Sequence, residues 1–177
     1  VTLDGHLASA VDRARATLLA DMPGLTIDFH TASDWTEDQA ALARCKADIA
    51  RGDIIVVTML FLEEHVRAIA PALAARRDSC DAMMCCFSAG EVTKLTRAGR
   101  FSMSAEATGA LGMLKRLRGS RKPGQSSGAG QMKLLRQIPR LLRFVPGTAQ
   151  DLRAYFLTLQ YWLAGSEEKV VAMVRYL

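Results

Sequence analysis

The sequence predicts an α/β fold, a flavodoxin- or Rossmann-like parallel sheet of about four strands with flanking helices and a helical carboxyl-terminal appendix. Two short apolar runs carry this prediction, one in residues 53–59 and one at the start of residues 82–91. Each is bounded by polar residues and followed at once by a helix-type segment, as in strands buried on both faces of a parallel sheet. The loops that leave such strands at their carboxyl ends form the ligand crevice of the fold. The polar residues in those loops are Glu63, Glu64, His65, Ser88 and Glu91.

Before the first apolar run, the pattern predicts two strands and two helices. Residues 1–3 look like the tail of a strand, the apolar residues of 6–20 recur at helical spacing, and apolar and polar residues alternate over 25–29. Thr36 and Gln39 have the spacing of a capping box, which opens a helix. We expect Gly52 to end that helix in the left-handed conformation.

The segment 61–77 follows the first run and has an apolar stripe at helical spacing that begins at Leu62. Pro71 lies inside it and lacks a backbone N–H, so we expect a kink or a new helix start there. After the second run, Ser88 and Glu91 repeat the capping-box spacing and predict a fourth helix. A helix start with free N–H groups also binds anions, here at Ser88, Gly90 and Glu91, but the spacing favours capping.

The composition indicates one main domain in a reducing compartment. Half of the 177 residues are hydrophobic, and no apolar run approaches the roughly 20 residues that span a bilayer. We therefore expect a soluble, cytoplasmic protein without a transmembrane segment. The four cysteines lack zinc-site spacing and are expected to be buried or inert thiols, and no metal site is predicted. They are Cys45, Cys80, Cys85 and Cys86.

The net charge of +5 is concentrated in one segment. Residues 107–150 hold nine basic and no acidic residues, which leaves 14 basic and 18 acidic residues elsewhere. We expect residues 1–106 to form the α/β domain and 107–147 a basic helical segment with a flexible Gly/Ser-rich loop at 119–130. Such a segment can contact a membrane, nucleic acid or a partner helix, or can simply be solvated. Its near lack of aromatic residues argues against single-stranded nucleic acid.

Residues 148–177 are expected to form docking helices. The first is capped at Thr148–Asp151, carries apolar residues at helical spacing and ends at Gly165. The second begins at Ser166 and reaches Leu177 without a cap, so we expect this chain to be cut from a longer protein. The apolar positions of the first helix are Leu152, Tyr155, Phe156, Leu159, Trp162 and Leu163.

Four stretches together resemble one protein family. They read VTLDGH (1–6), VTMLFLEEH (57–65), MCCFSAGEVTKLTR (84–97) and YFLTLQYWLAGSEE (155–168). In number and order they look like the amino-terminal domain of the large, porphyrin-binding H subunit of magnesium chelatase. The excess of Arg over Lys and the abundance of Ala hint at a bacteriochlorophyll-making bacterium.

The resemblance implies part of an ATP-dependent metal–porphyrin ligase of photosynthesis. The enzyme inserts Mg²⁺ into protoporphyrin IX, both of them substrates, on the way to chlorophyll or bacteriochlorophyll, and AAA+ partner subunits hydrolyse the ATP. The partners implied are those ATPase subunits, the remainder of the H subunit and the porphyrin. We expect the isolated fragment to be inactive and to hold no cofactor tightly. No nucleic-acid partner is expected.

Two groups of residues are candidates for chemistry in this setting. Metal insertion removes two pyrrole protons and strips water from Mg²⁺, tasks suited to the carboxylates of Glu63 and Glu64 and to His65. Two Glu in the first turn of a helix also complement its dipole without any further role. In the basic segment, arginine side chains suit the porphyrin propionates or an acidic partner surface. Those residues are Arg136, Arg140 and Arg143.

A second interpretation sets the resemblance aside. The chain would then be a non-enzymatic α/β interaction module with a basic helical tail that binds a partner. A free-standing module of this kind is expected to end in a complete, capped helix, so the uncapped end favours the fragment.

Overall fold

A computed structural model describes residues 1–103, Pro139 and residues 148–177. Its central pair of strands, β1 (Ile54–Thr58) and β2 (Ala82–Cys86), forms where the two apolar runs were expected. The strands are parallel and pair along their whole length, from Ile54 opposite Ala82 to Thr58 opposite Cys86. The predicted α/β class and both central strands are therefore confirmed.

The sheet is mixed, so the expectation of a wholly parallel flavodoxin-like sheet is wrong for the described strands. Two strands of two residues each, β3 (Arg97–Ala98) and β4 (Phe101–Ser102), complete the order β1-β2-β3-β4 and pair antiparallel. A parallel crossover needs a dozen or more residues, usually a full helix. Only ten residues separate β2 from β3, and their helix α4 (Gly90–Thr93) has a single turn. The chain instead turns back, so that β3 runs antiparallel to β2 and forms a short hairpin with β4.

The amino-terminal segment lies beside β1 without forming a strand. The Val1 amino group donates to the Val56 carbonyl at 2.8 Å, and the Thr58 N–H donates to the Val1 carbonyl at 2.9 Å. On its other side, Thr2 forms one isolated parallel bridge with Thr31. The two strands expected at residues 1–3 and 25–29 are thus not found. The apolar residues of 25–29 instead pack against buried side chains of α1, α7 and α8. This packing explains why apolar and polar residues alternate here although the segment pairs with no strand.

The predicted longer helices are present, although their ends differ from the prediction. They are α1 (Ala8–Asp21), α2 (Gln39–Arg51), α3 (Glu63–Arg76), α7 (Thr148–Ala164) and α8 (Glu167–Tyr176), with a short 3₁₀ helix η1 (Ala32–Thr36) before α2. The Thr36 capping box is wrong: Asp38 caps α2 by accepting from the Ala41 N–H at 3.0 Å. Gly52 ends that helix with φ −63°, not in the left-handed region. Helix α3 continues through Pro71, so no new helix starts there.

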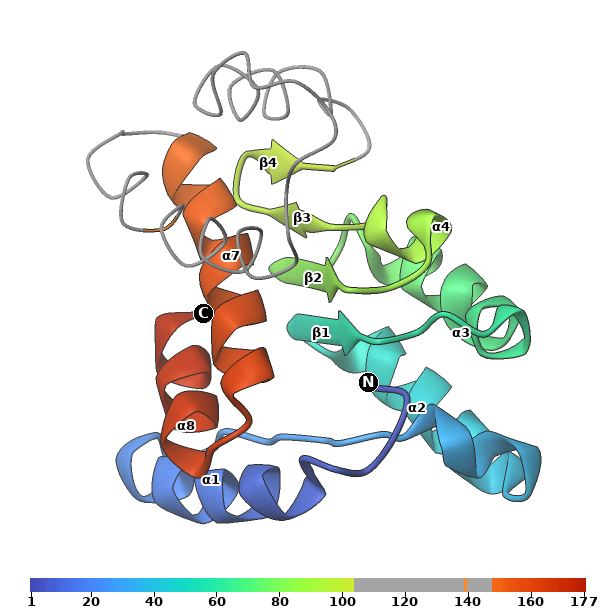
Figure 1. Ribbon diagram of the computed structural model, residues 1–177, viewed down its shortest axis with the longest axis horizontal. Helices are drawn as coiled ribbons and strands as arrows, with labels where there is room; N and C mark the ends of the chain where they lie inside the picture. The colour runs from blue at the N-terminus through green and yellow to red at the C-terminus, as the bar shows by residue number, and fades with distance from the viewer. Residues whose placement is uncertain (104–138, 140–147) are drawn as a thin grey trace, which may run out of the picture.

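Both faces of the sheet are covered by helices, as Figure 1 shows. One face carries Ile55, Val57, Met83 and Cys85, which join a core with side chains of α2 and α3. Helix α7 lies on the opposite face, against β2, β3 and β4. Helix α8 packs between α7 and α1 in a third cluster that includes Trp162.

The turn between β3 and β4 ties the sheet to α7. Gly99 has φ +54°, and a Cβ there would lie 2.9 Å from Asp151 Oδ1, so only glycine fits. The Arg100 N–H donates to Asp151 Oδ2 at 2.9 Å. Helix α7 begins at Thr148 and stops before Gly165, whose φ is +65°, as the sequence predicted. The predicted 107–147 segment lies outside the described residues, apart from Pro139, and the division into three parts stays a prediction.

Truncation of Leu159 on α7 should destabilise the chain, because its side chain is 5% exposed in the sheet-facing core. We expect Leu159→Ala to lower the free energy of unfolding by about 2–4 kcal/mol, the usual cost of a buried Leu-to-Ala change. Leu163, one turn further on, is 45% exposed and provides the matched control. Leu163→Ala should cost less than about 0.5 kcal/mol. Urea denaturation of the two variants measures the difference, and equal losses would contradict this placement of α7.

Candidate functional site

The loops that leave β1 and β2 at their carboxyl ends are joined by hydrogen bonds. The Met59 N–H donates to the Phe87 carbonyl at 2.8 Å, and the Ala89 N–H donates to the Leu60 carbonyl at 2.7 Å. The Leu60 N–H donates to Ser88 Oγ at 3.2 Å, and the Ser88 hydroxyl donates to the Cys86 carbonyl at 3.1 Å. The two loops therefore form one fixed surface, at the place where a ligand crevice was predicted.

Ser88 joins these loops and does not cap a helix. Helix α4 has Ala89 at its amino-terminal cap position and no side-chain capping bond, so the predicted Ser88–Glu91 capping box is wrong. Leu60 lies beyond the end of β1, so its N–H needs a hydrogen-bond acceptor outside the strand ladder, and the Ser88 hydroxyl oxygen provides it. Gly90 and Glu91 are exposed. Anion binding by Ser88, Gly90 and Glu91 stays a prediction.

Glu63 and Glu64 lie on the first turn of α3, as predicted, and their side chains are exposed. Glu63 forms an ion pair with Arg67, one turn further along the helix. Leu62, Glu63, Glu64 and Arg67 line a shallow hollow of about 340 Å³. The two carboxylates thus face solvent beside a small depression.

His65 points into the core, away from solvent, and is only 5% exposed. Its ring packs edge-on against Trp35, with 5.7 Å between ring centroids and an interplanar angle of 80°. Its Nε2 lies 3.7 Å from Glu64 Oε1, and its buried Nδ1 has no hydrogen-bond partner. The structure therefore separates the imidazole from the exposed surface of Glu63.

Three apolar residues of these loops are exposed, which the sequence did not reveal. Phe61, Leu62 and Phe87 are 53%, 49% and 46% exposed. Leu62 was expected at the start of the inner stripe of α3, but it precedes the helix at the cap position and points outward. Nothing in an apolar run distinguishes a residue inside the strand from one just beyond its end, so spacing alone could not find this surface.

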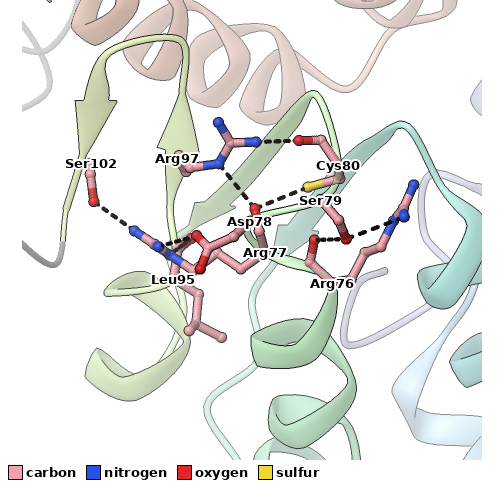
Figure 2. Close-up of polar contacts among 8 residues, drawn as sticks. All are labelled: Arg76, Arg77, Asp78, Ser79, Cys80, Leu95, Arg97 and Ser102. Atoms are coloured by element: carbon pink, nitrogen blue, oxygen red, sulfur yellow. Dashed lines mark hydrogen bonds and ion pairs between the residues drawn. The ribbon is translucent and has the colours of Figure 1, made fainter.

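Arginine residues gather near the other end of the sheet, where they hold the backbone together (Figure 2). Arg97 Nε donates to the Arg77 carbonyl at 3.0 Å, and Arg97 also donates to the Cys80 carbonyl. Arg77 Nε donates to the Leu95 carbonyl at 3.2 Å and its Nη2 to Ser102 Oγ at 2.6 Å. These guanidinium groups fix the end of α3 to the β3–β4 hairpin. No motif predicted them, because the partners lie about 20 residues apart in the chain.

All four cysteines are buried and free, as expected for inert thiols. Burial raises the pKa of Cys45 to about 11 and the pKa values of Cys85 and Cys86 to about 12. Burial also raises the pKa of the Tyr155 hydroxyl, beside Cys86. At neutral pH the thiols of Cys45, Cys85 and Cys86 are therefore protonated, whereas the thiolate is the nucleophilic form of cysteine.

Three further predictions concern a metal site, a membrane-spanning helix and the arginines of the basic segment. Within residues 1–103 and 148–177, no three His, Cys, Asp or Glu side chains group so as to hold a metal ion. No helix in that same part of the chain has the length and apolar character needed to cross a membrane. Arg136, Arg140 and Arg143 lie outside the described residues.

Comparisons with known proteins point to the same family over most of the chain. A family model described as "Domain of unknown function (DUF3479)" matches residues 1–156. The H subunit of magnesium chelatase from Cereibacter sphaeroides is 46% identical over 177 residues, and its counterpart from Rhodobacter capsulatus is 44% identical over 177 residues. Each match covers all of this chain and 15% of the relative. The chloroplastic ChlH subunit of magnesium chelatase from Oryza sativa subsp. indica is 30% identical over 178 residues, 96% of this chain and 12% of the relative.

The free energy of unfolding should fall as the pH rises above 9, because the thiols ionise first in the unfolded chain. Their ordinary pKa is 9.0, whereas burial raises it to about 11 for Cys45 and about 12 for Cys85 and Cys86 in the folded chain. The stabilisation is complete below pH 9 and is lost between pH 9 and 12. Each thiol ionised only in the unfolded state contributes a slope of about −1.4 kcal/mol per pH unit.

Urea denaturation at a series of pH values from 8 to 11 measures this slope. Cys86→Ala removes one of the three thiols and should make the slope shallower, while the midpoint at pH 8 reports any packing loss separately. Rapid reaction of the folded chain with a thiol reagent at pH 8, as fast as in urea, would show that the thiols are accessible and would refute the prediction.

Proposed function

Since the chain belongs to the family described as "Domain of unknown function (DUF3479)", we propose that it is one domain of the large, porphyrin-binding subunit of a magnesium chelatase. The observation that carries this proposal is the 46% identity to the H subunit of a magnesium chelatase over all 177 residues. The same match favours it over a free-standing interaction module. The chain spans about 15% of the length of that relative, so the proposal concerns one domain of a longer protein.

In the complete enzyme, the reaction proposed is insertion of Mg²⁺ into protoporphyrin IX in the cytoplasm. AAA+ partner subunits supply the energy by hydrolysing ATP. Two pyrrole protons must leave the porphyrin, and Mg²⁺ must shed water that it releases reluctantly. Both Mg²⁺ and protoporphyrin IX are substrates, and we expect this domain alone neither to hold them tightly nor to catalyse the reaction.

The pathway proposed is that of bacteriochlorophyll. The chain is 46% and 44% identical to the two bacterial subunits and 30% identical to the rice subunit. The sequence's preference for Arg over Lys agrees with this assignment.

Of the three candidates for catalysis, the two carboxylates retain the better support. Glu63 and Glu64 are exposed beside the hollow. Carboxylates can accept protons from pyrrole nitrogens and can bind hydrated Mg²⁺. His65 packs against Trp35 in the core, which favours a packing role. An exposed Glu at the first turn of a helix also stabilises the helix dipole, so the carboxylates need a direct test.

Chelatase activity of the full-length subunit with its ATPase partners tests the proposed function. Wild-type subunit should convert protoporphyrin IX to its Mg²⁺ complex, and the 177-residue chain in its place should give none. If the carboxylates assist the chemistry, Glu63→Gln together with Glu64→Gln should lower kcat at least tenfold at unchanged porphyrin affinity. Glu37→Gln, at an exposed Glu that follows η1 and belongs to neither candidate site, is the control. Unchanged kcat in the double variant would exclude the carboxylates, and an inactive wild-type subunit would exclude the function.

The basic segment is proposed to bind the porphyrin propionates or an acidic surface of another domain or partner subunit. Its support is the concentration of nine basic residues without an acidic one in residues 107–150. Neutralising Arg136, Arg140 and Arg143 to Gln should weaken porphyrin binding or complex assembly, and the loss should shrink as salt screens the charges. Fluorescence titration with porphyrin at two salt concentrations measures it. Binding that is unaffected by either the substitutions or salt would argue against this role.

A further inference from the structure

The fixed loops after β1 and β2 present an apolar surface to solvent. Phe61, Leu62 and Phe87, which we call the loop patch, are each about half exposed. The hydrogen bonds from Met59 to Phe87 and from Ala89 to Leu60 hold the two loops side by side, so the three side chains lie at one edge of the sheet. Exposed apolar side chains grouped at one edge of a sheet are typical of an interaction site.

The backbone of both loops is strained where it creates this surface. Met59 has φ +60° and Phe87 has φ +48°, and these are the non-glycine residues with positive φ in the described part of the chain. The left-handed conformation costs a residue with a Cβ about 1–2 kcal/mol. Positive φ is uncommon outside glycine and is a particular anomaly for a bulky residue such as Phe. Phe87 thus combines a left-handed backbone with a side chain that is 46% exposed, and backbone strain of this kind is concentrated at functional sites.

Charge beside the loop patch limits what can bind there. Glu63 and Glu64 follow Leu62 directly, and Arg67 forms an ion pair with Glu63, so the carboxylate of Glu64 makes this border negative. A second copy docked about a twofold axis would bring the same carboxylates together. An apolar surface with basic residues is the complement.

We propose that the loop patch docks against another domain of the same large subunit, one that presents apolar side chains flanked by Lys or Arg. This inference rests on the proposed function, because it takes the chain to be one part of a longer polypeptide. The chain covers 15% of the Cereibacter relative, so about 85% of such a subunit lies outside it. A domain on the same polypeptide meets the patch at a high effective concentration, and a modest apolar surface then suffices for stable docking.

Photo-crosslinking in the full-length subunit tests the proposal. A photoreactive phenylalanine analogue, p-benzoylphenylalanine, replaces Phe87, and the same analogue at Leu19 is the control, since Leu19 on α1 is 44% exposed. We expect at least tenfold more crosslinking from position 87, with the product at the mass of a single subunit. The crosslinked peptide should come from outside residues 1–177 and be rich in Lys or Arg.

The other outcomes overturn the proposal. Equal yields at both positions would mean that the patch is free, and a product of doubled mass would mean a second copy. Crosslinks to an ATPase subunit or to porphyrin would identify a different occupant. Chelatase activity of the wild-type subunit is measured in parallel, so a failure of the proposed function is recognised separately from a failure of docking.

Two further variants separate docking from folding. Phe87→Asn keeps a residue that tolerates the left-handed conformation but removes the ring. Hydrogen exchange in loop residues 59–62 of the full-length subunit should then rise at least tenfold, while β1 stays protected. Glu64→Lys should lower the crosslinking yield from position 87 at least threefold at low salt, because it repels a basic partner. Unchanged exchange and yield would refute the docking surface.

Discussion

The rest of the structure depends on burying both faces of one parallel strand pair. Strands β1 and β2 are apolar on both faces, and two strands alone are at best marginally stable in water, so other elements must cover them. Helices α2 and α3 meet this requirement on one face from neighbouring sequence. The other face is covered by α7, which begins more than 60 residues after β2. The domain is therefore complete only when its carboxyl-terminal helices return to the sheet.

The same constraint explains why the loops after β1 and β2 stand out. Their carboxyl ends point to one edge, where the hydrogen bonds of Ser88 and the neighbouring backbone replace the ladder that has ended. The loops are joined by these bonds, have positive φ at Met59 and Phe87, and expose aromatic side chains. Under the proposed function, this surface is the one that docks the chain against another domain of the subunit.

Charge is distributed differently from apolar surface. The arginine residues of the described core, Arg77 and Arg97, bind backbone carbonyls and hold the hairpin to α3. The carboxylates of Glu63 and Glu64 instead face solvent beside the loop patch. Charges that hold the backbone and charges that face solvent thus lie at opposite ends of β1 and β2, so substitutions at the two ends should have separable effects on folding and on the proposed docking.

The sequence by itself determined the local elements: the two central strands, the five longer helices and the burial of the thiols follow from apolar spacing within short windows. Only the tertiary structure decided the direction of β3, the bond of Ser88 to Leu60, the inward turn of His65 and the exposure of Phe87. The physical reason is the distance along the chain over which each interaction acts. Apolar periodicity is a property of neighbours along the chain, whereas a hydroxyl or a ring finds its partner among residues that folding brings together.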